Sequence, residues 1–280
     1  MTKNELNKVL ENHKLWLNDE GGAWANLKDT DLRGTDLRGI DLRYANLKNT
    51  DLYSANLRGA DLRYAHLRYA NLKGADLRDV NLKYADLKYA NLRYADLYGA
   101  NLKNANLRYA NLYSVDLNNA DLDNADLRGA DLRYTGLMNT DLNNADLSDT
   151  DLRYTSLNGA NLTNVKTNIY TIGYNLACPE EGSFIGYKKA KDCIVKLLIM
   201  EDSKRSSATS IKCRCDKAKV LDIEKIDSSE KVESVPSNYN NDFVYRVGEI
   251  VKVDNFDENR WNECSTGIHF FMNKQNAIKY

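Results

Sequence analysis

Hydrophobic and polar positions recur with a period of five through the first part of the chain. Leucine occupies every fifth position from Leu27 to Leu162, which gives 28 consecutive repeats over residues 25–164. The residue directly before each leucine is mostly Asp or Asn, and the residue after it is mostly Lys or Arg. Two residues before each leucine stands Ala or Thr, with three larger exceptions: Ile40, Val80 and Val115. The repeating unit is A-(D/N)-L-(K/R)-(Y/G/N).

This period fits neither a helix nor a single strand. On an α-helix, five residues advance about 500°, so the leucines would spread around the whole cylinder. On one strand, an odd spacing would place successive leucines on opposite faces. A chain that takes a short extended step and then turns a corner every five residues buries them all, with Gly or Asn at the corner, where they tolerate a positive φ.

Four such corners close a square, so a coil takes about 20 residues and 28 repeats make about seven coils. Coils stacked about 4.8 Å apart form a rod roughly 33 Å long. Residues 20 apart then stack in columns, and each fully buried leucine contributes roughly 1.5–3 kcal/mol before the cost of ordering. One such column is the predicted structural core: Leu27, Leu47, Leu67, Leu87, Leu107, Leu127 and Leu147.

The repeats resemble the pentapeptide-repeat family. The run ADLKYANLRYADLYG at residues 85–99 carries the resemblance, as does ADLRY at residues 60–64, and it extends over all of residues 25–164. The resemblance implies a right-handed quadrilateral parallel β-helix. This agrees with the geometry above and adds the handedness.

The outward positions form columns of their own. Two columns are aromatic and one is basic: Tyr44, Tyr64 and Tyr84; Tyr69, Tyr89 and Tyr109; and Arg38, Arg58 and Arg78. Stacked columns stabilise a rod by contacts between coils. Tyr and Arg are also the residue types enriched at binding hot spots, so the same columns are predicted partner-binding residues.

Residues 1–24 are predicted to form a helical cap, because a repeat array needs its open end covered. Thr2 followed by Glu5 fits a capping box. Leu6, Val9, Leu10, His13 and Leu17 fall on one helical face, and Gly21-Gly22 is expected to end the helix. His13 and Trp16 are interpreted as packing residues of this cap.

The five-residue period stops after Leu162, and residues 165–182 are expected to be a connector. Residues 183–280 are predicted to form a small β-rich (α+β) domain, so that the chain as a whole is mainly β. The expected strands and final helix are 184–188, 193–200, 207–215, 219–226, 243–253, 267–272 and 274–279. The segments SSAT at 206–209, Cys213-Arg214 and CSTGIHFF at 264–271 resemble an uncharacterised domain found fused to pentapeptide repeats. That resemblance implies no activity.

Four residues of this second domain raise the question of a metal or catalytic site. Cys213 and Cys215, with Cys264 and His269, offer four ligands of the kind that zinc prefers, but their spacing departs from that of typical structural sites. Cys264 and His269 could instead be a nucleophile and its base. A histidine packed in an apolar strand is the commoner explanation of His269, so no metal, cofactor or catalytic residue is assigned.

Charge limits the function classes. The chain has 39 basic and 40 acidic residues, a net charge of −1, which argues against a dedicated nucleic-acid binder. Along the repeats the charge is uneven: residues 25–109 carry a net +5 and residues 110–164 a net −6. Some pentapeptide-repeat proteins modulate type II topoisomerases such as DNA gyrase by mimicking DNA. Here only the acidic half, around Asp116, Asp121, Asp123 and Asp126, could do so.

The function predicted is that of a non-enzymatic interaction or scaffold protein, with an unknown protein partner. Topoisomerase modulation is the first alternative, and enzymatic or metal-dependent activity of the C-terminal domain is the second. No stretch approaches 18 consecutive apolar residues, so no membrane span is expected. The N-terminus is charged and lacks the apolar region of a secretory signal, and the five cysteines do not read as a disulfide framework, so a cytoplasmic protein is expected.

Overall fold

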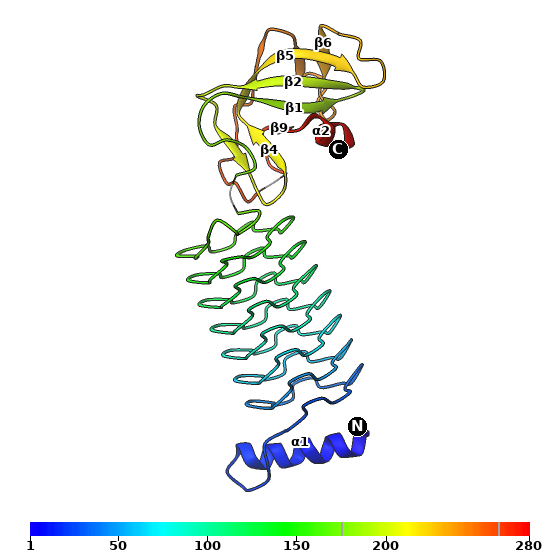
Figure 1. The fold of residues 1–280 in the computed structure, drawn as a ribbon, viewed down its shortest axis with the longest axis vertical. Helices are drawn as coiled ribbons and strands as arrows, with labels where there is room; N and C mark the ends of the chain where they lie inside the picture. The colour runs from blue at the N-terminus through cyan, green and yellow to red at the C-terminus, as the bar shows by residue number, and fades with distance from the viewer. Residues whose placement is uncertain (175, 263) are drawn as a thin grey trace. The chain divides into compact units, whose positions relative to one another are not determined.

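A computed structural model describes residues 1–174, 176–262 and 264–280. The chain divides into two compact units, Met1–Ile172 and Gly173–Tyr280, and each is described here by itself. The first consists of one helix and a stack of four-sided coils, and the second is built on an antiparallel sheet (Figure 1). The predicted mainly β fold, with its β-helix, N-terminal helix and β-rich C-terminal domain, is confirmed.

Each coil is tied to the next by parallel bridges between residues 20 apart, as between Asn26 and Asn46. Three kinds of backbone hydrogen bond between coils recur along the stack. In the first repeat, the N–H of Leu27 donates to the carbonyl of Asn46 over 2.8 Å; the N–H of Asn46 donates back to Ala25 over 2.9 Å, and that of Asp29 donates to Lys48 over 3.0 Å. The bridges continue to Lys166 and Ile172, where the step from Asp151 is 21 residues instead of 20. Residues 165–172 therefore extend the ladder.

We call the coils of residues 25–172 the rod. In its interior, leucines pack against small residues. From Leu27 to Leu157 every leucine of the repeat is at most 2% exposed, and only Leu162 is half-buried. The alanines between them, such as Ala45 and Ala85, are equally buried. Threonines in the core keep their hydroxyls satisfied, because Thr50 donates to the carbonyl of Leu27 over 2.7 Å. A threonine at an inward position, such as Thr50, therefore fits the apolar interior with its hydroxyl hydrogen-bonded.

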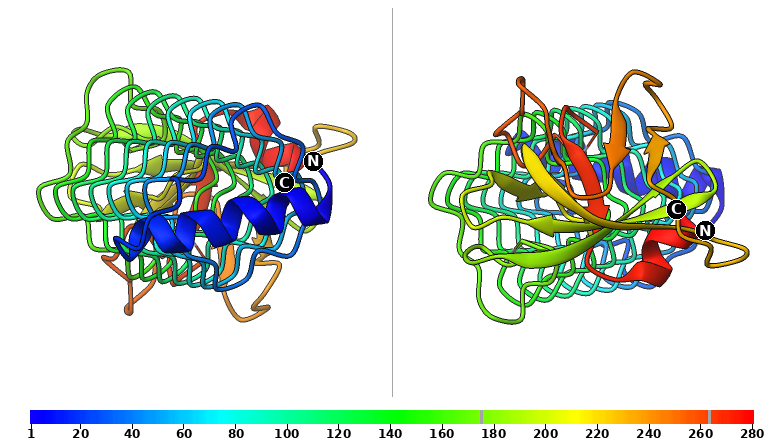
Figure 2. Two further views of the ribbon diagram at one scale, coloured as in Figure 1. Left: turned by 90° about the horizontal axis from the view of Figure 1, so that it is seen from below. Right: turned by 90° about the horizontal axis from the view of Figure 1, so that it is seen from above.

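Helix α1 (Lys3–Leu17) covers the first coil, and Figure 2 shows it lying across the end of the stack. The predicted capping box is present: the Thr2 hydroxyl accepts from the Glu5 N–H and the Glu5 carboxylate accepts from the Thr2 N–H. His13 is completely buried, and its Nδ1 accepts the N–H of Ala25 over 3.0 Å. The helix ends at Leu17 with Asn18 as its C-cap, four residues before the expected Gly21-Gly22.

The second unit has a seven-stranded antiparallel sheet in the order β3-β4-β9-β1-β2-β5-β8 and a two-stranded sheet β6-β7. Its core gathers mainly on one face of the large sheet, around Val195, Leu197 and Phe270. The short helix α2 packs on the other face, where Ala277 meets Ile194 and Phe271. The elements are β1 (Phe184–Ala190), β2 (Cys193–Ile199), β3 (Arg205–Ser207), β4 (Lys212–Cys215), β5 (Lys217–Lys225), β6 (Ser234–Pro236), β7 (Val244–Arg246), β8 (Ile250–Lys252), β9 (Ile268–Phe271) and α2 (Lys274–Lys279).

Two of the expected strands are wrong. The segment expected as one strand over 207–215 is a hairpin, in which β3 and β4 pair from Arg205–Cys215 to Ser207–Cys213. The segment expected as one strand over 243–253 is two strands in different sheets, because β7 pairs with β6 and β8 pairs with β5. Gly248 has a φ of +88° between them, which marks the break.

Candidate functional site

The tyrosines of the repeats owe their position to an unusual backbone. The fifth residue of all 28 repeats has a positive φ, and nine of these residues are tyrosines, such as Tyr44 with a φ of 62°. The turn is closed by a hydrogen bond from the Ala45 N–H to the carbonyl of Leu42, over 3.1 Å. A left-handed conformation costs a side-chain-bearing residue about 1–2 kcal/mol, so each tyrosine needs compensation from its contacts.

Stacking between coils supplies that compensation. In the Tyr44 column (Tyr44, Tyr64 and Tyr84) successive ring centroids are 4.9 Å apart with nearly parallel planes. In the Tyr69 column (Tyr69, Tyr89 and Tyr109) they are 5.0 and 5.2 Å apart. The six residues remain 39–49% exposed. Each column is therefore a row of rings that hold one another while their edges and hydroxyls face solvent.

A third aromatic column, which the sequence analysis missed, runs along another face. The Tyr94 column consists of Tyr94, Tyr113, Tyr134 and Tyr154, with Tyr134 and Tyr154 stacked at 4.8 Å. Its signal was the 20-residue step from Tyr134 to Tyr154, but Ser114 interrupts the step from Tyr94. Tyr113, one position earlier in its repeat, fills that gap.

Basic side chains accompany the tyrosines. The Lys83 ammonium lies 5.2 Å from the centre of the Tyr84 ring, and the Lys88 ammonium lies 4.9 Å from that of Tyr89. Such cation–π contacts fix the flexible lysine stems over the rings. The two columns thus present rings and positive charge together on the first half of the rod.

Each arginine of the predicted basic column forms an ion pair with at least one nearby aspartate. Arg38 pairs with Asp36 at 2.6 Å and Arg58 with Asp79 at 3.5 Å. Arg78 pairs with both Asp76 and Asp96. The Arg38–Asp36 and Arg78–Asp76 pairs join the residue after a leucine to the residue before it.

The Asp or Asn before each leucine has a second role that the sequence analysis did not identify. Its side-chain oxygen accepts the backbone N–H two residues later, as Asp31 Oδ1 does from Arg33 over 3.1 Å and Asn56 Oδ1 from Arg58 over 3.1 Å. This Asx turn starts the corner and explains why Asn and Asp are interchangeable there.

The acidic half of the rod is partly paired as well. Asp121 and Asp123 both face the Lys103 ammonium, at 3.6 and 3.2 Å, and Asp126 pairs with Arg128 at 2.6 Å. Among the described residues Asp116 forms no ion pair; its Oδ1 accepts the N–H of Asn118. The net negative charge is real, but much of it is balanced locally.

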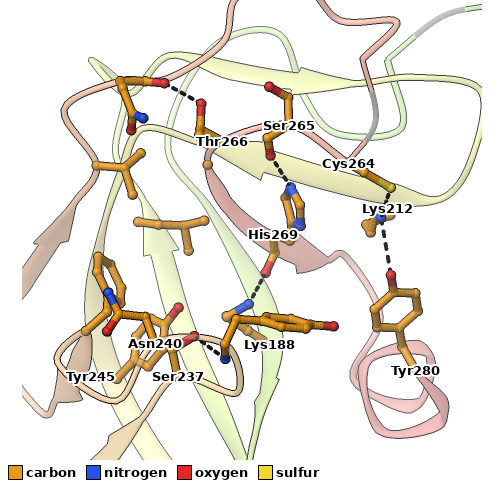
Figure 3. A pocket seen from close by; sticks show the side chains of 16 residues that line it. Lys188, Lys212, Ser237, Asn240, Tyr245, Cys264, Ser265, Thr266, His269 and Tyr280 are labelled. Carbon is orange, nitrogen blue, oxygen red and sulfur yellow. Dashed lines mark hydrogen bonds between the residues drawn. The ribbon is translucent and has the colours of Figure 1, made fainter.

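The second unit contains a cavity of about 480 Å³, which we call the Lys188 cavity (Figure 3). Strands β1, β4 and β9 contribute Lys188, Lys212 and His269, and the C-terminal Tyr280 closes one side. Strands β1 and β9 are paired at Tyr187 and Phe271 only, so beyond that pair their backbones are no longer bridged. The Lys188 amine reaches across and donates to the carbonyl of His269 over 3.3 Å.

Burial changes the acid–base properties of the cavity. It lowers the pKa of Lys188 to about 8, and the neighbouring Lys212 lowers it as well. Burial also lowers the pKa of His269 to about 4, with Lys212 and Lys188 acting in the same direction. At neutral pH His269 is therefore uncharged, and because its Nε2 lies 3.0 Å from the carbonyl of Ser265, that nitrogen carries the proton.

The four cysteine and histidine residues considered as metal ligands are not brought together. Cys213 and Cys215 lie in the hydrophobic core, where a hydrogen bond with the Cys178 thiol, together with burial, raises the pKa of Cys213. In the pairing of β4 with β9, His269 lies opposite Arg214, so its side chain is on the other face of the sheet from the two cysteines. Within residues 1–174, 176–262 and 264–280, no three Cys, His, Asp or Glu residues are grouped as a metal site would require.

Cys264 and His269 do line the same cavity, but their polar contacts differ. The Cys264 thiol is 3.9 Å from the Lys212 ammonium, whereas the His269 Nε2 is engaged with Ser265. A base would need its unprotonated nitrogen directed at the thiol. In the part of the chain that the structure describes, no hydrogen bond joins these two side chains.

The comparisons identify the class of the chain. The family described as pentapeptide repeats (8 copies) matches residues 23–59, 55–93, 85–124, 95–133 and 135–166. These segments cover more than half of the chain, and the chain belongs to the pentapeptide-repeat family. Residues 174–277 match a family of unknown function, DUF5758. Both resemblances predicted from the sequence are thereby confirmed.

Solved structures of pentapeptide-repeat proteins are similar to part of the chain. HetL of the cyanobacterium Nostoc sp. strain PCC 7120, a protein involved in heterocyst differentiation regulation, is 30% identical over 51% of this chain and 81% of its own, with a TM-score of 0.25. The protein alr5209 of Nostoc PCC 7120 is 34% identical over 39% and 84%, with a TM-score of 0.30. QnrB1, a plasmid-mediated fluoroquinolone resistance protein, is 20% identical over 52% and 84%, with a TM-score of 0.36.

No curated protein matches the chain. Within the described residues, no helix has both the length and the apolar character required to cross a bilayer.

Proposed function

We propose that the protein is a non-enzymatic interaction scaffold, in which the Tyr44 and Tyr69 columns of the rod dock a protein partner. One observation carries this proposal: six tyrosines are held in a costly left-handed conformation, stacked at 4.9–5.2 Å, and still left exposed. Rings fixed in this way lose little conformational freedom on binding, and tyrosine is a favoured hot-spot residue.

The chain itself provides the substitution that tests this. In the Tyr44 column, Asn104, Asn124 and Asn144 follow the tyrosines in the same left-handed position. The double variant Tyr64→Asn/Tyr84→Asn should therefore keep the coil geometry while removing two rings. Tyr134→Asn/Tyr154→Asn is the matched control, because it removes two rings stacked at 4.8 Å from the Tyr94 column.

Proteins retained from a native lysate by the immobilised full chain and by both variants would be compared by quantitative mass spectrometry. A docking role predicts at least one protein that the full chain retains and the Tyr64/Tyr84 variant loses, while the control keeps it. If all three baits retain the same proteins and the variants only melt at lower temperature, the columns are structural and the proposal is wrong.

A second candidate function rests on the acidic half of the rod. The net −6 of residues 110–164 supports DNA mimicry toward a type II topoisomerase, with Asp116, Asp121, Asp123 and Asp126 presenting the charge. The ion pairs of Asp121, Asp123 and Asp126 weaken that support. A DNA gyrase supercoiling assay, with and without a fluoroquinolone, tests it: inhibition or protection at micromolar protein that Asp116→Asn/Asp121→Asn reduces is the expected result. Unchanged supercoiling at that concentration contradicts it.

A further inference from the structure

The Lys188 cavity has the composition of a ligand site. Its volume of about 480 Å³ lies within the range of about 300–1,000 Å³ that is usual for small-molecule pockets. The ammonium groups of Lys188 and Lys212 and the neutral imidazole of His269 face it from three strands. None of the described residues that line it has a carboxylate side chain. The cavity is therefore positively charged on its described walls.

Lys188 is the group whose environment needs explanation. Its side chain is half-buried and forms no ion pair with a described residue. Among those residues its ammonium donates only to the neutral carbonyl of His269. Even partial burial of a cation without a counter-charge is costly, and here a second ammonium raises that cost. An anion in the cavity would offset both the burial and the repulsion between the two ammonium groups.

The remaining walls indicate what the anion is attached to. Phe243 packs edge-on against the buried Tyr245, with ring centroids 5.4 Å apart. Tyr280 is held by a hydrogen bond from the Lys212 ammonium over 3.2 Å, and Tyr239, which is 88% exposed, lies at the rim. Flat apolar walls around a charged centre suit a ligand with one anionic group and an aromatic body.

We propose that the Lys188 cavity binds a small aromatic anion, whose carboxylate, sulfonate or phosphate group contacts the Lys188 and Lys212 ammonium groups while its ring lies against Phe243 and Tyr280. This site is independent of the tyrosine columns, since its residues all belong to the second unit. Failure of the docking proposal for the rod leaves it unaffected.

Two fluorescent probes of the same shape test the proposal on the full chain. They are 1-anilinonaphthalene-8-sulfonate, which is an aromatic anion, and N-phenyl-1-naphthylamine, which lacks the sulfonate. The full chain should bind one equivalent of the anionic probe, and Lys188→Gln should weaken that binding at least tenfold. Lys188→Arg, which keeps the charge, should retain it within about threefold. The neutral probe should bind more weakly and equally to all variants.

Lys219→Gln is the matched control, because Lys219 is an exposed lysine of β5 away from the cavity lining. It should change the affinity for the anionic probe less than twofold. Equal affinities for Lys188→Gln and the unaltered chain, or an equal loss in Lys219→Gln, would overturn the proposal.

Competition on the unaltered chain gives a result even where Lys188→Gln does not fold, which far-ultraviolet circular dichroism would reveal. Benzoate should displace the anionic probe at a concentration at least tenfold lower than benzyl alcohol does. Inorganic phosphate, which has no ring, should compete more weakly than benzoate. Equal competition by phosphate would show that the ring contributes nothing and would contradict the proposed aromatic anion. Displacement by benzyl alcohol at the same concentration as benzoate would show an uncharged site and contradict the proposal.

Discussion

The two units of this protein show two ways in which a sequence fixes the surroundings of its side chains. In the rod, a residue's environment follows from its position in a five-residue unit and from the residue 20 positions away. Charges are paired within one repeat, as Asp31 is with Arg33 at 2.6 Å. In the second unit, neighbours come from distant segments, and a cation such as Lys188 is half-buried without an opposite charge among the described residues. The regular repeat thus places opposite charges next to each other. The irregular packing of the second unit instead leaves the Lys188 cavity with two lysines on its walls.

The largest expected effect is on the leucine core. Leu87 is completely buried in a column between Leu67 and Leu107. Leu87→Ala leaves a cavity that neighbouring coils cannot close, and we expect a loss of about 3 kcal/mol in the free energy of unfolding. Urea denaturation measures it. In the second unit Ile199→Val removes one methylene from the core and should cost about 1 kcal/mol. A loss below about 1 kcal/mol for Leu87→Ala would show that coils can repack.

Substitution of two glycines tests whether tolerance of a side chain follows from the position in the repeat or from the surrounding packing. A side-chain carbon on Gly186 of β1 would lie 2.6 Å from Cδ2 of Phe270, so Gly186→Ala should destabilise the second unit by about 2 kcal/mol. Gly59 has a φ of +65° and open space around it. Because Asn119 and Asn139 occupy the same column in the same conformation, Gly59→Asn should change stability by less than about 0.5 kcal/mol. Thermal unfolding of both variants measures these changes. A larger effect at Gly59 would show that the fifth position of a repeat does not by itself determine whether Asn is tolerated.

Acid should affect the second unit through His269. Its folded pKa of about 4 lies below the unfolded value, so the unfolded chain binds the extra proton between the two. Its contribution to stability is fully present above about pH 6.5 and is lost as the pH falls toward 4, by on the order of 2 kcal/mol.

Unfolding followed at pH 7, 6 and 5 measures this loss, and His269→Gln should reduce it. His66→Gln serves as the control, since His66 is exposed on the rod. An identical pH dependence in the original chain and in His269→Gln would show that His269 is not responsible.

The smallest effect is expected for a surface pair of the rod. Arg128 contacts Asp126 at 2.6 Å and Asp146 at 3.7 Å, and both partners are partly exposed. Arg128→Gln should cost less than about 1 kcal/mol, and the difference should shrink in 0.5 M salt. A larger, salt-independent loss in urea denaturation would point to packing of the arginine stem instead.

The fold of the rod could be predicted because its information is local. Leu27 to Leu162 set the period, and a five-residue turn with Asp or Asn before leucine needs no distant partner. The third tyrosine column escaped prediction because Tyr113 substitutes for Ser114 one position away. That exchange is visible only once the turn geometry is known.

The second unit could be predicted less completely because its strands depend on partners far along the chain. β8 is three residues long and exists through its pairing with β5, so no local pattern separates it from β7. The Lys188 cavity unites Lys188, Lys212, Phe243, His269 and Tyr280 from five segments. The sequence also suggested Cys213 and Cys215 as metal ligands, whereas both are residues of the hydrophobic core.

The ladder between coils also has a mechanical consequence. Its hydrogen bonds run from coil to coil, as from Leu27 to Asn46, and therefore lie along the axis of the rod. A pulling force along that axis acts on every interface between coils, but at the pulled end of the chain it concentrates on the bonds nearest the pulled residue. The end coil is therefore expected to detach first while the other coils keep their shape. Each detached coil of 20 residues would release about 65 Å of chain in place of about 4.8 Å of rod. Under tension the rod would therefore lengthen in steps of equal size, one for each coil that detaches.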